Sequence, residues 1–108
     1  MPTTYKILGQ SVPEATSNTN LYTVPVATQA VCSTISICNR GVSTNFRLAV
    51  RPAGANLSNE HFIVYDNYVS QYDSLMLTLG ITLAANDIVT VYTGANTMSF
   101  SLFGAEIT

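Results

Sequence analysis

Apolar and polar residues alternate with a period of two through most of this sequence. The clearest run is Ala30–Cys38, where one face receives Val31, Ser33, Ile35 and Ile37 and the other receives Cys32, Thr34 and Ser36. Successive side chains of an extended chain point to opposite faces, so this period is typical of strands that are buried on one side. No segment convincingly carries the period of a helix of two or more turns, and only Ser70–Leu77 is ambiguous. The sequence therefore predicts an all-β protein.

These alternating runs recur at intervals of roughly ten residues, with Gly, Pro, Asn and Asp between them. We expect strands at residues 4–11, 21–24, 30–38, 45–51, 61–66, 74–79, 88–93 and 98–107. This spacing is typical of an antiparallel β-sandwich of jelly-roll or Ig-like topology, here with seven to nine strands. A length of 108 residues suits one core, so residues 1–108 should form a single β-sandwich domain.

The turn residues add expectations about how the strands connect. Asn39-Arg40-Gly41 is a turn signal, and it predicts a hairpin between Ala30–Cys38 and Asn45–Arg51. Gly80 interrupts an apolar run and predicts a bulge or bend. The residues in phase on the apolar strand faces should form the core between two sheets: Ile35, Ile37, Phe46, Leu48, Val50, Val64, Leu77, Leu79, Val89, Val91, Phe100 and Leu102.

The chain carries little charge, which limits its partners. Only 9% of the residues are charged, the net charge is −2, and just four residues are basic. Phosphate binding needs clustered cations, so we expect no nucleic-acid surface. The N-terminus has no apolar signal segment, and the apolar stretch from Ile88 to Ala105 alternates like two strands and a turn. No membrane role is therefore expected, whereas a weakly charged surface favours packing against a neighbour.

The two cysteines, Cys32 and Cys38, lie in one expected strand. At the rise of an extended chain they are roughly 20 Å apart, which is far beyond the reach of a disulfide. Their even spacing predicts that both lie on the same face, as buried free thiols that act as small apolar groups. Free thiols fit assembly in a reducing cytoplasm.

We find no complete catalytic or metal-binding motif. His61 is the only histidine, and we expect it to be a residue at a strand edge or an interface. The six acidic residues are scattered, and Asp87 follows Asn86 in a turn, where capping of the backbone is favoured over calcium binding. The chain lacks a nucleophile elbow, a phosphate loop and a Cys-x-x-Cys pair. We expect no enzyme, no metal and no cofactor.

Tyrosines are the most suggestive surface residues. Tyr65, Tyr68 and Tyr72 crowd one region and alternate with Asp66 and Asp73. Three interpretations remain open: half-buried strand residues, a protein–protein surface, for which tyrosine is enriched, or a platform for stacking a glycan.

Several stretches together suggest a family. They are YKILGQSVP near the N-terminus, LYTVPVATQAVCSTISICNRG (Leu21–Gly41), LTLGITLAANDIVTVYT (Leu77–Thr93) and MSFSLFGAEIT (Met98–Thr108). With these stretches the chain resembles, over nearly its whole length, small virion proteins of tailed bacteriophages, including phages of cyanobacteria. The motifs are structural rather than chemical, and no catalytic residues accompany them.

The resemblance implies a capsid decoration, or cement, protein: a β-sandwich structural protein that binds the outer surface of the shell and stabilises it. Its partners would be the phage major capsid protein and further copies of itself, as a homotrimer assembled in the host cytoplasm and located on the virion. The alternative is a tail-fibre or baseplate module that recognises a host receptor. Expected contact residues are Tyr5, Tyr65, Tyr68 and Tyr72, and the polar segments Met1–Tyr5 and Pro13–Asn20 are candidate contacts to the shell.

Overall fold

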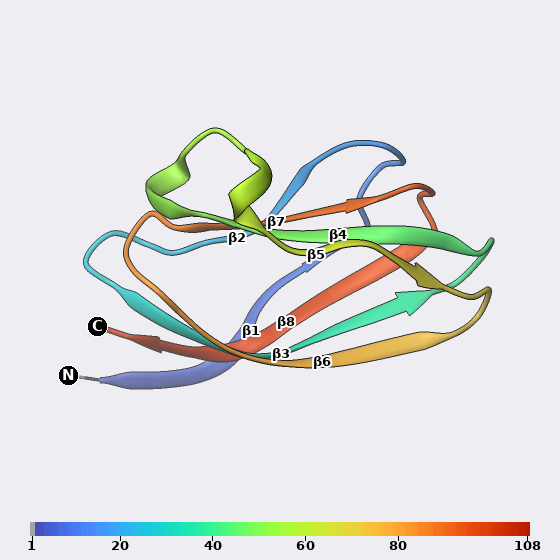
Figure 1. Ribbon diagram of the computed structural model, residues 1–108. Helices are drawn as coiled ribbons and strands as arrows, with labels where there is room; N and C mark the ends of the chain where they lie inside the picture. The colour runs from blue at the N-terminus through green and yellow to red at the C-terminus, as the bar shows by residue number, and fades with distance from the viewer. Residues whose placement is uncertain (1) are drawn as a thin grey trace.

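The computed structural model describes residues 2–108 and has the expected all-β architecture (Figure 1). Two short 3₁₀ helices, η1 (Pro52–Gly54) and η2 (Asn59–His61), precede the fifth strand. The eight strands are β1 (Thr3–Ser11), β2 (Thr19–Thr23), β3 (Gln29–Asn39), β4 (Thr44–Arg51), β5 (Phe62–Val69), β6 (Ser74–Leu83), β7 (Ile88–Thr93) and β8 (Met98–Ile107). Each expected strand forms, and β5 and β6 extend further toward their C-terminal ends than the alternation indicated.

The strands form two four-stranded antiparallel sheets that pack face to face as a sandwich. Sheet A has the order β1-β8-β3-β6 and sheet B has the order β2-β7-β4-β5. The first strand thus pairs with the last, the second with the seventh, the third with the sixth and the fourth with the fifth. This is the order obtained when one long antiparallel hairpin is rolled up, and it defines a jelly roll rather than an Ig-like sandwich. Both termini lie at the same end of the molecule (Figure 1).

The expected hairpin between the third and fourth strands is wrong. β3 belongs to sheet A and β4 to sheet B, so the turn after Asn39 carries the chain across the sandwich. Asn39 is buried and holds this crossing, because its Nδ2 donates to the carbonyl oxygens of Val42 (2.8 Å) and Val69 (3.1 Å). Turn residues and alternation cannot distinguish a crossing from a hairpin, since both need a reversal between two half-buried strands.

The core lies between the sheets, where it was expected. All twelve predicted residues are either fully buried or packed against the buried cluster, with Val50, Val64, Leu77 and Leu79 in the second group. Phe46 and Phe100 meet edge to face with ring centroids 5.9 Å apart. The buried cluster also contains nine residues that the alternation did not select: Leu8, Leu21, Tyr22, Val24, Ala30, Cys32, Val69, Leu83 and Met98.

A line of irregularities crosses sheet A and changes the phase of β1 and β3. The pairing register shifts between Ile7 and Gly9 in β1 and between Cys32 and Thr34 in β3, and β6 gains an extra residue at Gly80, whose φ is +65°. The bulge predicted at Gly80 is thereby confirmed. The extra residues in β1 and β3 reverse which face the following side chains occupy, whereas the alternation of β6 continues across Gly80, with Leu79 and Ile81 both packed against the core.

This change of phase corrects the expectation for the cysteines. Cys32 lies in the core, but Cys38, beyond the bulge, is exposed. The two side chains therefore lie on opposite faces of sheet A, and the prediction that both are buried is wrong for Cys38. The prediction that they are unpaired is confirmed, because both thiols are free.

Candidate interaction surface

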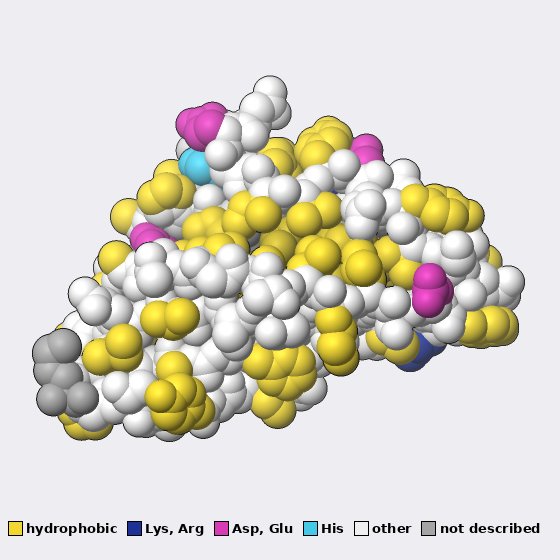
Figure 2. Space-filling model, turned by 60° about the horizontal axis from the view of Figure 1, so that its bottom comes forward, with side chains coloured by type: hydrophobic (Ala, Val, Ile, Leu, Met, Phe, Trp, Pro, Cys, Tyr) yellow, Lys and Arg dark blue, Asp and Glu magenta, His cyan; other side chains and the backbone are white. Residues whose placement is uncertain are grey.

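The outer face of sheet A is the least charged surface of the described residues. Its four strands contain only two charged residues, Lys6 and Glu106. Exposed apolar side chains stand among small Ser and Thr residues on this face: Tyr5 (85% exposed), Met76 (71%) and Ile7 (49%). The part of the molecule that sheet A forms, in the lower half of Figure 2, is accordingly apolar and uncharged polar, with charges at its margins. Arg40 lies at one end, where its Nε donates to Ser99 Oγ (2.9 Å).

The two charged residues of sheet A point away from this face. Lys6 Nζ lies 3.3 Å from Glu106 Oε1, and the hydroxyl of Tyr22 in sheet B donates to Glu106 Oε2 at 2.6 Å. The hydrogen bond from Tyr22 and then the ammonium of Lys6 hold the pKa of Glu106 below its usual value. The charges are thus used to join the two sheets, and the outer face stays neutral.

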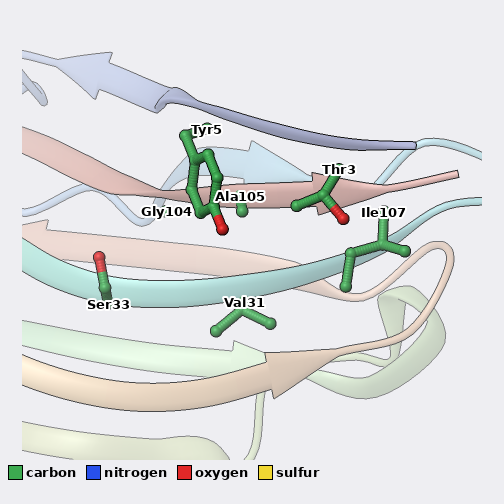
Figure 3. A pocket seen from close by; sticks show the side chains of 7 residues that line it. All are labelled: Thr3, Tyr5, Val31, Ser33, Gly104, Ala105 and Ile107. Atoms are coloured by element: carbon green, nitrogen blue, oxygen red, sulfur yellow. The ribbon is translucent and has the colours of Figure 1, made fainter. Parts of the chain in front are cut away.

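A shallow depression of about 330 Å³ lies on this face beside Tyr5 (Figure 3). It spans the three neighbouring strands β1, β8 and β3 and is lined by Thr3, Tyr5, Val31, Ser33, Gly104, Ala105 and Ile107. Tyr5, Ala105 and Val31 are directly opposite one another in the strand pairing, so the small Ala105 leaves space between two larger neighbours. The lining offers hydroxyls and apolar surface but no acid, base or cation. The depression is suited to receive an apolar side chain of a partner.

The outer face of sheet B differs, because its charges are already satisfied within the chain. Arg47 Nε donates to Asp66 Oδ1 at 2.6 Å, and the guanidinium carbon lies 4.3 Å from the ring centroids of both Tyr65 and Tyr92. Arg51 donates to Thr90 Oγ1 and Asn20 Oδ1. A partner that covered this face would have to desolvate these groups without offering better bonds.

The structure separates the four tyrosines predicted as contacts. Tyr5 lies on β1 in sheet A, whereas Tyr65 and Tyr68 lie on β5 in sheet B and Tyr72 lies in the turn before β6. All four are exposed. The ring of Tyr65 contacts both Arg47 and Phe62, with a centroid distance of 4.9 Å to Phe62, so part of its role is internal packing. Only Tyr5 belongs to the uncharged face.

The two polar segments that were candidate contacts to the shell are held by the fold. Thr3–Tyr5 pair with β8, and Pro2 accepts a backbone hydrogen bond from Thr108, while Met1 lies outside the described residues. In the second segment Pro13 is buried and the Thr16 N–H donates to the Thr93 carbonyl oxygen at 2.8 Å. Neither described segment has the freedom of an adaptable arm.

The remaining candidate residues have structural roles. His61 ends η2, and its Nδ1 accepts from the Ser58 N–H at 3.2 Å. Asp87 accepts the N–H groups of Ala53 and Ala84, both at 2.8 Å, which confirms backbone capping. Within residues 2–108 no three His, Cys, Asp or Glu side chains gather as a metal site would require. No helix in this part of the chain is long and apolar enough to cross a membrane.

Comparison with known proteins adds no family. The sequence matches no protein-family model, and no curated protein matches it. What the fold and surface define is a class: an eight-stranded jelly-roll sandwich with one neutral outer face.

Proposed function

We propose that this chain is a non-enzymatic structural subunit of a bacteriophage virion, a decoration protein that binds the outer surface of the capsid through the outer face of sheet A. The observation that carries the proposal is the neutrality of that face, on which Tyr5, Ile7 and Met76 are exposed. Interface centres are depleted of charged residues because buried charges lose hydration. The resemblance to small phage virion proteins supplies the partner, the major capsid protein.

The geometry of the face supports binding to a broad and fairly rigid partner. Four paired strands hold the face, so little conformational entropy is lost when it is covered. The depression beside Tyr5 can accept one apolar side chain, and the surrounding Ser and Thr hydroxyls can donate and accept without the cost of desolvating a charge. Such a contact is modest for one copy and becomes effective when many copies cover a lattice, because linked copies bind with avidity.

Two substitutions with matched exposure test which face binds the shell. Ile7 in sheet A is 49% exposed and Ile63 in sheet B is 48% exposed, so we expect the free protein to tolerate a lysine equally at either position. Ile7→Lys should weaken binding to particles that lack this protein by about tenfold or more, because it places a charge in the covered face. Ile63→Lys should bind like the wild type. Equal binding of both variants would contradict the assignment of sheet A.

The location of the protein tests the function itself. Purified virions should contain hundreds of copies, measured as band intensity against the major capsid protein. Particles assembled without the protein should lose stability to heat or osmotic shock. A few dozen copies or fewer, found only on the tail, with unchanged particle stability, would instead favour the tail-fibre or baseplate recognition module.

A further inference from the structure

Three of the four edge strands carry features that prevent pairing with another chain. β1 has the charged Lys6 and an irregular register at Leu8, and β2 has only five residues and is followed by Pro25. β5 has two register shifts, and Asp66 within it adopts a left-handed φ of 55°. Charges, bulges, prolines and short length are the usual means by which natural sheets avoid edge-to-edge association.

β6 is the exception. Its ten residues, Ser74–Leu83, include no charged residue and no proline, although β6 is the outer strand of sheet A. Its one irregularity is the bulge at Gly80, which leaves Ser74–Leu79 as a regular stretch paired with β3 on one side only. An edge of this kind presents unpaired N–H and C=O groups to any chain that can lie alongside it.

The side of the sandwich that β6 borders is also open. On the opposite side, β1 and β2 lie against each other, and Gly9 approaches Leu21 so closely that a side chain would not fit. The backbones of β5 and β6, by contrast, show no such close approach across the sandwich. Leu75, Leu77 and Leu79 are therefore only partly buried, and Figure 2 shows a band of hydrophobic side chains running along the molecule between its upper and lower parts.

We propose that β6 pairs antiparallel with β6 of a second copy of this chain, which joins the two A sheets into one eight-stranded sheet. The neutrality of β6 favours a second copy, because identical strands about a two-fold axis bring identical side chains together and any charge would meet its like. With Met76 on the axis, Leu75 lies opposite Leu77 of the second copy, and with Leu77 on the axis it lies opposite Leu79. In both cases the core-side residues of one copy lie on the same face of the joined sheet as those of the other. The partly buried leucines of both copies would then cover each other.

The expected affinity is moderate. A ten-residue strand is roughly 33 Å long, and with sheets about 10 Å apart the open side measures roughly 330 Å². A standard stable interface buries about 800 Å² per partner. We therefore expect a dimer that dissociates in the micromolar range in solution and forms more fully where copies are concentrated. A two-fold contact predicts a dimer rather than the trimer that the resemblance implies.

Sedimentation of the purified chain over the micromolar range tests this pairing, and it does not depend on the proposed function because no virion is involved. The wild type should pass from monomer to dimer. Met76→Lys, at a side chain that is 71% exposed, should shift the midpoint at least tenfold upward, because it places two cations close together at the axis. Ile7→Lys, on the same face but at the opposite edge strand, should dimerise like the wild type.

Cross-linking provides a second measurement. In a Cys38→Ser background, Met76→Cys is combined with Thr78→Cys. Position 76 faces position 76 of the second copy when Met76 lies on the axis and position 78 when Leu77 does, so two thiols lie opposite each other in both cases. The remaining native thiol, that of Cys32, is buried. Mild oxidation should give a covalent dimer on a non-reducing gel, and Ile7→Cys in the same background should give none. A wild type that stays monomeric, a trimer, or a dimer insensitive to Met76→Lys would overturn the proposal. A chain that dimerises but does not bind capsids would leave it intact and refute only the proposed function.

Discussion

At the scale of single residues, burial and hydrogen bonding separate chemically similar groups. Cys32 is in the core, and burial raises the pKa of its thiol to about 11, whereas Cys38 is exposed at the end of the same strand. Tyr22 has a buried ring, but its hydroxyl reaches Glu106 at the margin of the sandwich. Burial, followed by the hydrogen bond to this carboxylate, raises the pKa of Tyr22 above its usual value.

The cysteines should differ sharply in reactivity. In the native protein at neutral pH a thiol reagent should modify one thiol, Cys38, rapidly, and should reach Cys32 only when the chain unfolds, since the thiolate is the reactive form. Mass spectrometry after a short treatment should show a single adduct, and Cys38→Ser should abolish it. Two adducts formed at the same rate would contradict the burial of Cys32.

Tyr22→Phe should remove the bond to Glu106 and lower the free energy of unfolding by about 1.5–3 kcal/mol at neutral pH. Because the pKa of Glu106 is lowered in the folded state, its contribution is present above the usual carboxyl pKa and is lost as the pH falls through the lowered value. The difference between wild type and variant in denaturant titrations should therefore shrink below about pH 4. Tyr68→Phe, at an exposed ring, should have no effect at any pH.

At the scale of strands, the bulges of sheet A determine what each strand presents. β3 is neutral throughout, and its phase change moves Cys38 and Ser36 to the outside while Ile35 and Ile37 stay in the core. Glycines permit this line of irregularities for two different reasons. Gly80 has a positive φ and open space around it, whereas a side chain on Gly104 would collide with the backbone oxygen of Val31.

Alanine substitutions at Gly80 and Gly104 should separate the effect of a positive φ from the effect of a steric clash. Gly80→Ala should lower the free energy of unfolding by about 1–2 kcal/mol, because alanine is strained in a left-handed conformation. Gly104→Ala should cost about 3 kcal/mol or more, because the clash forces β3 and β8 apart in the middle of sheet A. Chemical denaturation of both variants measures the difference. Equal and small losses would show that β3 and β8 can separate at this point without penalty.

At the scale of the whole molecule, the jelly roll joins the ends of the chain. Thr3 pairs with Ile107, and Thr19 pairs with Val91, so the sheets require contacts between residues far apart in sequence. Only β4 and β5 are consecutive strands that pair with each other. The resulting sandwich is flat and elongated, with extents of 43 × 27 × 19 Å, which gives it broad faces for its size.

This topology predicts slow folding for a chain of this length. Closing large loops before any contact is gained slows proteins dominated by distant pairings, so refolding should take milliseconds to seconds rather than microseconds. Stopped-flow measurement of tyrosine fluorescence or far-ultraviolet circular dichroism after dilution from denaturant gives the rate. Refolding within microseconds would show that local contacts, and not the pairing of the chain ends, limit the process.

The sequence by itself determined the class of fold, the positions of the strands and the core. β7 and β8 begin and end where the alternation placed them, because a strand with one buried face must keep its period of two. The chemistry of Asp87 was also accessible from sequence, since an Asx residue in a turn has a local partner. These features depend on residues that are close together in the sequence, so they can be predicted from the sequence alone.

The tertiary structure alone decided which sheet each strand joins and which face Cys38 occupies. Alternation reports that one side of a strand is buried, but β3 and β4 are each buried on one side whether they share a sheet or face each other across the core. Ser33 carries no sequence signal for the register shift beside it, because it arises from pairing with Phe103 and Gly104 of a distant strand. The same holds for the neutral outer face, which exists because Lys6 and Glu106 turn inward to bond with each other and, through Glu106, with Tyr22 of the other sheet.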